Sequence, residues 1–188
     1  ITFIILHVLS IKSFSQNCVA DAGVNKAICL GDTIVIGGNP TASGFNSNLV
    51  YQWQPKDGLN NSNIANPLAN PINTTTYLVT ITDGICKDTS SVTIVVNNNP
   101  KPVAHAISPV CKDATLFLSA STGVSWNWSG PNGFSSMAQN PVITSVTYAA
   151  AGLYSVTVTN AQGCKGSDSV LVAVNPNAVA TSNSPICS

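Results

Sequence analysis

Charged side chains are scarce in this chain. Its 188 residues contain seven Lys, seven Asp and neither Arg nor Glu, so that 7% of the residues are charged, against roughly 25% in ordinary soluble domains. A polyphosphate ligand requires clustered Lys and Arg, because binding depends on the release of counterions. Here the lysines are scattered singly. The composition therefore argues against a nucleic-acid partner, and no basic amphipathic stretch suits a membrane surface.

The residues of hydrolytic chemistry are also few. Acid–base and nucleophilic mechanisms need a base, paired carboxylates or an activated nucleophile, whereas this sequence has two His, dispersed Asp and no G-x-S-x-G motif. The cysteines lack the C-x-x-C spacing of zinc sites, and the segment NNNPKP offers calcium no carboxylate. We expect no enzyme activity, no metal site and no cofactor, although a catalytic domain elsewhere in a longer protein stays possible.

In place of charge, the chain is rich in Asn, Thr, Ser, Val and Ala. β-Branched residues favour strands, and Asn and Ser favour tight turns. The sequence therefore predicts an all-β protein.

The first residues form an apolar run followed by small residues at Ser13 and Ser15. The run is too short to span a bilayer but suits a secretory signal. We interpret residues 1–15 as an N-terminally truncated signal peptide, with a buried strand as the alternative. The mature chain is then secreted or displayed at the cell surface, with no membrane span left after cleavage.

Two halves of the chain repeat one pattern after about eighty residues, a period of domain size. AICLGDTIVI at 27–36 matches PVCKDATLFL at 109–118. The hairpin sequence YLVTITDGICKDTSSVTIVV likewise matches YSVTVTNAQGCKGSDSVLVAV in the second half. The joints NNNPKP and NPNA bound the copies. We predict domains at 16–98 and 102–175, and a truncated third repeat at 178–188.

Alternation within the strands indicates which side chains meet in each core. In the hairpins one apolar set faces inward while Thr and Ser face outward, which predicts two antiparallel sheets packed as a sandwich. The aromatic pairs Tyr51/Trp53 and Trp126/Trp128 are two residues apart, so both members of a pair lie on one face of their strand. We interpret that face as the core side, with a carbohydrate-stacking platform as the alternative. The predicted core aromatics are Tyr51, Trp53, Tyr77, Trp126, Trp128 and Tyr154.

The cysteines occur at matching sites in the two copies, and an exported protein keeps disulfides. The preferred pairing lies within each module, Cys29 with Cys86 and Cys111 with Cys164, which leaves Cys18 and Cys187 unpaired. The alternative joins Cys18 to Cys86 and Cys29 to Cys164. A bridge over such a loop stabilises a small domain by roughly 4 kcal/mol in the chain-entropy model.

Several motifs resemble a known family. The runs ANP…TTTYLVTITDGIC and QNP…AAGLYSVTVTNAQGC, preceded by YQW and WNW, together with GPNGF, are similar to PKD-like and bacterial immunoglobulin-like repeats of Bacteroidetes surface proteins. The resemblance covers nearly all of residues 19–175. It implies tandem immunoglobulin-like β-sandwiches, extracellular display, and a role in adhesion or as spacers between other domains.

Two functions follow as rival expectations. An adhesive module would present loop residues, for which Phe45 and Phe134 are the candidates, to glycans or to extracellular or matrix proteins. A stalk would only hold another domain away from the cell, with neighbouring repeat modules of the same chain as its partners. The pattern Asp-Ser/Thr-apolar also marks Thr33 and Ser169 as candidate O-glycosylation sites, with an ordinary strand start as the alternative.

Overall fold

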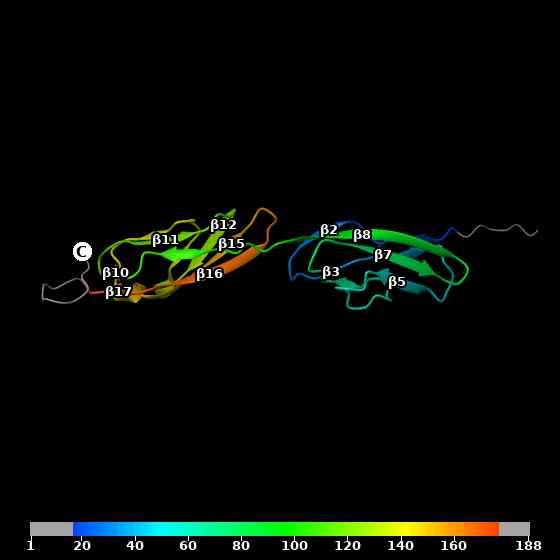
Figure 1. Ribbon diagram of the computed structural model, residues 1–188, viewed down its shortest axis with the longest axis horizontal. Helices are drawn as coiled ribbons and strands as arrows, with labels where there is room; N and C mark the ends of the chain where they lie inside the picture. The colour runs from blue at the N-terminus through cyan, green and yellow to red at the C-terminus, as the bar shows by residue number, and fades with distance from the viewer. Residues whose placement is uncertain (1–16, 177–188) are drawn as a thin grey trace, which may run out of the picture. The chain divides into compact units, whose positions relative to one another are not determined.

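The computed structural model describes residues 17–176, which fold almost entirely into β-strands with two short 3-10 turns. The chain divides into two compact units, Ile1–Val96 and Asn97–Ser188, called unit 1 and unit 2 below (Figure 1). The division falls at the edge of the Asn/Pro-rich joint. The predicted signal peptide and third repeat lie outside the described residues. Between residues 17 and 176 no helix is long and apolar enough to cross a bilayer.

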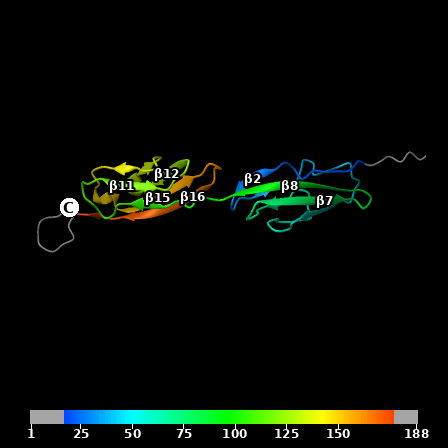
Figure 2. The same cartoon turned by 45° about the horizontal axis from the view of Figure 1, so that its top comes forward.

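Unit 1 is built from β1 to β8. Its main sheet has the order β2-β8-β7-β5, while β1 pairs with β4 and β3 with β6. The long hairpin of β7 and β8 is antiparallel, and Figure 2 shows these two strands side by side. The strands are Val19–Ala20, Lys26–Cys29, Ile34–Val35, Ala42–Ser43, Val50–Gln54, Leu68–Ala69, Thr75–Thr82 and Lys87–Asn97.

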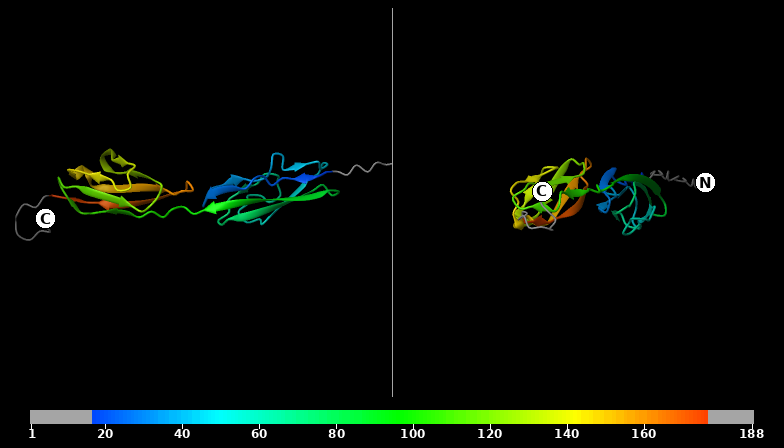
Figure 3. Two further views of the ribbon diagram at one scale, coloured as in Figure 1. Left: turned by 90° about the horizontal axis from the view of Figure 1, so that it is seen from above. Right: turned by 60° about the vertical axis from the view of Figure 1, so that its left-hand side comes forward.

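Unit 2 is built from β9 to β17. Its main sheet has the order β13-β12-β15-β16, a second sheet has the order β14-β11-β9, and β10 pairs in parallel with β17. Figure 3 shows β16 running along β15. The strands are Ala104–Ala106, Val110–Cys111, Leu116–Ala120, Ser125–Ser129, Ser135–Ser136, Val142–Ile143, Gly152–Thr159, Lys165–Val172 and Val174–Asn175; the 3-10 turns are Pro131–Gly133 and Tyr148–Ala150.

Each unit has its own apolar core, and strand alternation places the residues in it. In β7, Tyr77, Val79 and Ile81 are fully buried, while the residues between them are at least partly exposed. β15 buries Tyr154, Val156 and Val158 in the same way. Two-residue periodicity puts these side chains on one face of the sheet. The facing layer supplies Ile36 in unit 1, and Leu116 and Leu118 in unit 2.

Candidate functional site

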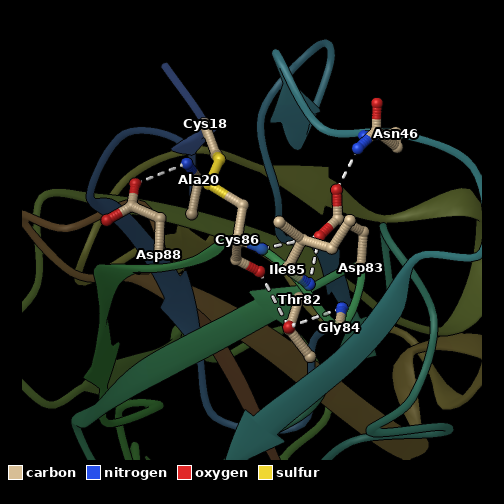
Figure 4. The surroundings of a disulfide bond; sticks show 9 residues. All are labelled: Cys18, Ala20, Asn46, Thr82, Asp83, Gly84, Ile85, Cys86 and Asp88. Atoms are coloured by element: carbon tan, nitrogen blue, oxygen red, sulfur yellow. Dashed lines mark hydrogen bonds between the residues drawn. A yellow bond between two sulfur atoms is a disulfide. The ribbon is translucent and has the colours of Figure 1, made fainter. Parts of the chain in front are cut away.

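A disulfide joins Cys18, just before β1, to Cys86 in the turn between β7 and β8, with 6.4 Å between the Cα atoms (Figure 4). The turn is shaped by Asp83, whose Oδ1 accepts hydrogen bonds from the backbone N–H groups of Ile85 and Cys86 at 2.9 and 2.7 Å. Its other carboxylate oxygen accepts one from Asn46 N at 2.8 Å. Asp83 thus ties the hairpin turn to the neighbouring loop of residues 44–49.

The predicted pairing of Cys29 with Cys86 is wrong, because Cys86 is bonded to Cys18. The reason is the place of β2 beside β8. Asn25, just before β2, accepts a hydrogen bond from Thr93 N at 2.8 Å, well along β8, whereas Cys86 precedes that strand. A disulfide requires Cα atoms within about 7 Å, and several residues of strand at roughly 3.3 Å each exceed that distance.

The topology of unit 2 likewise separates Cys111 from Cys164. Cys111 lies opposite Asn175 in β17, while Cys164 precedes β16, which spans 8 residues, or about 26 Å at the usual rise. The prediction that these cysteines are oxidised is nevertheless met, since Cys29, Cys111 and Cys164 are each disulfide-bonded. Cys18, predicted to be unpaired, is also bonded, and Cys187 lies outside the described residues.

An aspartate joins the sheets at the same place in each unit. Asp88 of β8 accepts a hydrogen bond from Ala20 N, and Asp168 of β16 accepts one from Ala104 N, both at 2.7 Å. These bonds, together with one from the next backbone N–H, lower the pKa of both carboxyl groups. Sequence reasoning missed this role, although each Asp follows a hairpin cysteine closely in the sequence.

The predicted core aromatics differ in burial. Trp53, Trp128, Tyr77 and Tyr154 have no exposed surface, whereas Tyr51 and Trp126 are partly buried against the cores. A tryptophan without exposed surface has no face for a sugar, so these rings do not form the alternative stacking platform.

The two buried tyrosines each hold a loop through the hydroxyl group. Tyr77 Oη donates to the carbonyl of Asp57 at 2.9 Å, and Tyr154 Oη donates to the carbonyl of Ala150 at 3.0 Å. Burial raises the pKa of both tyrosines, with a smaller contribution from the Asp57 charge in the case of Tyr77. Each hydroxyl therefore acts as a neutral donor that fixes loop geometry.

The two candidate loop aromatics turn inward. Phe45 is half-buried against the core of unit 1, and Phe134 is half-buried in unit 2 with its ring edge-on to Tyr154, at 5.4 Å between centroids. Truncating either residue would therefore disturb packing as well as any binding surface. The exposed part of the first loop is instead its polar section, residues 46–48.

Each unit has a hollow between two loops, and in unit 2 the buried Tyr154 lines it. In unit 1 it measures about 440 Å³ and lies between Asp57–Gly58 and the segment 70–75. In unit 2 it measures about 310 Å³ and lies between Pro131–Phe134 and the segment 143–150. Both hollows use a left-handed glycine, Gly58 or Gly133, at φ 75° and 72°. The sequence contains no signal for these hollows, because each is lined by two segments that come together only in the folded chain.

The remaining predicted sites are on the surface. Thr33 and Ser169 are both exposed. The carboxylate of the preceding aspartate accepts a backbone hydrogen bond in each case, Asp32 from Cys29 N at 3.2 Å and Asp168 from Ala104 N. O-glycosylation stays a prediction. Across residues 17–176, no three His, Cys or Asp side chains gather into a possible metal site.

Comparison with known protein families finds a match for one part of the chain. Residues 91–174, from the second half of β8 in unit 1 to the start of β17 in unit 2, match the PKD domain. No curated protein matches. The chain therefore contains an all-β module of the PKD and immunoglobulin-like kind.

Solved structures with immunoglobulin-type domains are also similar to the chain. Extracellular domains 3–5 of Drosophila OTK share 16% identity at a TM-score of 0.43, covering 81% of this chain and 59% of that one. The titin fragment I67–I69 shares 14% identity at a TM-score of 0.39, covering 81% and 63%. The amphioxus IgVJ-C2 molecule shares 15% identity at 0.35, covering 78% and 99%. The chain thus spans less than two thirds of the OTK and titin fragments.

Proposed function

We propose that this chain is a non-catalytic section of a larger secreted or cell-surface protein of the Bacteroidetes type, built from tandem immunoglobulin-like, PKD-like modules that bind glycans or extracellular proteins. The PKD match of residues 91–174 supports the module type. Disulfide bonding of the described cysteines supports an oxidising, extracellular setting. The few titratable groups of the described surface support a binding role rather than a catalytic one.

The observation that carries the adhesive function is the anchored polar loop of unit 1. Phe45 packs against the core at one side of this loop, and Asn46 N donates to Asp83, which also shapes the disulfide-bearing turn (Figure 4). Residues 46–48 are exposed. Binding by a loop loses less entropy when the loop is already held in place, so this loop is suited to recognition.

A binding assay tests this function. The oxidised chain is immobilised and exposed to a panel of glycans and matrix proteins. Adhesion predicts that a panel member binds and that Ser47→Lys, which places a long charged side chain on the loop, abolishes binding. Ser91→Lys is the matched control, because Ser91 is exposed on β8, in the sheet and away from the loop. Absence of binding across the whole panel contradicts the adhesive function.

A spacer is the second candidate, favoured by the segment that enters unit 2. The carbonyl of Asn98 accepts a hydrogen bond from Asn160 Nδ2 at 3.0 Å, so this segment is held against the turn between β15 and β16. Held linkers of Asn and Pro are suited to semi-rigid stalks. A spacer predicts no panel binding. It also predicts that Asn160→Ala speeds amide hydrogen exchange in the segment that enters unit 2, whereas unchanged exchange contradicts this role for Asn160.

A further inference from the structure

The hollow of unit 2 has the composition of a small-ligand site. Its floor is apolar and buried, formed by Val146 and Tyr154, with the half-buried ring of Phe134 at its side. Its rim carries the exposed polar side chains of Asn132 and Thr147. A volume of about 310 Å³ is at the small end of ligand pockets, which span roughly 300–1,000 Å³.

The rim side chains are available to a ligand. The amide of Asn132 and the hydroxyls of Ser145 and Thr147 make no hydrogen bond to any other residue within 17–176. Together they offer donors and acceptors without charge, and no Lys or Asp side chain lines this hollow. A ligand that satisfies such groups is neutral and rich in hydroxyls.

The backbone holds these groups in place. Asn132 has φ 54° and ψ 34°, and Ser145 has φ 53°, so both residues adopt the left-handed conformation that non-glycine residues seldom use. The turn is closed by Phe134 N donating to Pro131 O at 3.1 Å and Gly130 N donating to Phe134 O at 3.0 Å. Such conformations concentrate at ligand sites, and here the two residues line the same hollow.

The hollow of unit 1 provides a contrast within the same chain. The residues that line it, all between 55 and 75, include Asp57 and the aliphatic Ile72 but no aromatic residue to match Phe134. An aromatic ring offers a flat apolar face to a sugar ring, whereas an aliphatic side chain such as Ile72 does not. The two hollows therefore differ in the features that select a sugar.

We propose that the hollow of unit 2 binds one neutral sugar ring, with an apolar face of the sugar against Phe134 and its hydroxyls bonded to Asn132, Ser145 and Thr147. This inference goes beyond the proposed function, which depends on the polar loop of unit 1, and adds a second binding site in unit 2. Affinity for a single ring is expected to be millimolar, because the hollow is small and few polar side chains line it.

An NMR titration of the oxidised, isotope-labelled chain tests the site. The probes are the methyl glycosides of glucose, galactose, mannose and N-acetylglucosamine, with N-acetylphenylalanine amide as an apolar probe. At least one glycoside is expected to shift the amide resonances of Gly133, Phe134 and Thr147 saturably. No shift with any glycoside, or larger shifts there with the phenylalanine probe, overturns the proposal.

Matched variants separate binding from folding. Asn132→Gly keeps the left-handed backbone but removes the amide, and Thr147→Val removes the hydroxyl at nearly constant shape; each is expected to weaken glycoside binding at least tenfold. Thr144→Val is the control, because Thr144 is exposed beside the hollow but does not line it. Equal affinity of Asn132→Gly, Thr147→Val and the parent chain overturns the proposal.

The two functional ideas fail separately. If the panel assay finds a ligand but the glycosides leave unit 2 unshifted, adhesion stands and the sugar site is wrong. If the glycosides shift the hollow while no panel member binds, the hollow is a sugar site without the adhesive role.

Discussion

The carboxylate of Asp88 accepts a hydrogen bond from the backbone N–H of Ala20 at 2.7 Å, across 68 residues of chain. Ala20 belongs to β1, which pairs with β4, whereas Asp88 belongs to β8 in the four-stranded sheet. One side chain therefore joins two sheets. Asp168 and Ala104 make the corresponding bond between β16 and β9 in unit 2.

Asp88→Asn is expected to lower the Tm of unit 1 by a few degrees at neutral pH, because the amide keeps an acceptor but loses the charge-assisted bond. Hydrogen bonds from Ala20 and then Thr89 lower the pKa of Asp88 in the folded state. Its contribution is therefore present above the ordinary carboxyl pKa and is lost as the pH falls below about 4.

The measurement is thermal unfolding as a function of pH. The difference in Tm between the parent and Asp88→Asn should shrink as the pH falls below about 4. Asp57→Asn is the control, because its carboxylate accepts no hydrogen bond among the described residues. A difference that stays constant across this pH range would show that the Asp88 charge is unimportant.

Cys18→Ser with Cys86→Ser is expected to lower the free energy of unfolding of unit 1 by roughly 4 kcal/mol, since the disulfide closes a loop with a sequence separation of 68. Urea denaturation of the double variant measures this loss. Non-reducing peptide mapping of the parent should yield a peptide joining Cys18 to Cys86, and reports the partners of Cys29, Cys111 and Cys164 in the same experiment. A peptide joining Cys29 to Cys86 would contradict the structure.

Alternation in the sequence was enough to predict the hairpins and the all-β class. β7 and β15 bury every second residue, and this period is local, so it can be read without knowing the fold. The disulfide pairing could not be read in this way. It depends on which end of β8 lies near each cysteine, and this is set by the pairing of β2 with β8.

The candidate site was only partly accessible from the sequence for a similar reason. Phe134 was singled out as an aromatic residue of an end loop, but its half-buried position depends on Tyr154, which lies in β15, the third strand after it. Asn132 and Ser145 line one hollow because their two loops lie beside it in the folded chain. Local pattern indicates that a residue is in a loop, whereas the facing loop is fixed by tertiary packing.

Tyr77→Phe and Tyr154→Phe are each expected to lower the free energy of unfolding by about 1 kcal/mol, because each removes one intramolecular hydrogen bond. Burial raises the pKa of both hydroxyls. Their contribution is therefore complete below the ordinary tyrosine pKa and is lost as the pH rises above about 10. Denaturation at neutral and alkaline pH measures both effects, and a parent chain whose stability is unchanged across the alkaline range would contradict the assignment.

The two buried tryptophans are expected to respond differently to the same substitution. Trp53 Nε1 donates to the carbonyl of Ile64 at 3.0 Å, whereas the buried Nε1 of Trp128 has no hydrogen-bond partner among residues 17–176. Replacement by Phe shortens a fully buried side chain in both cores. Trp53→Phe also leaves the Ile64 carbonyl without its donor, whereas Trp128→Phe deletes an N–H donor that has no acceptor among the described residues. An unpaired buried polar group costs roughly 1–3 kcal/mol. Trp53→Phe should therefore reduce the free energy of unfolding more than Trp128→Phe, by at least about 1 kcal/mol. Equal losses in urea denaturation would mean that Trp128 Nε1 is satisfied in solution by a bound water.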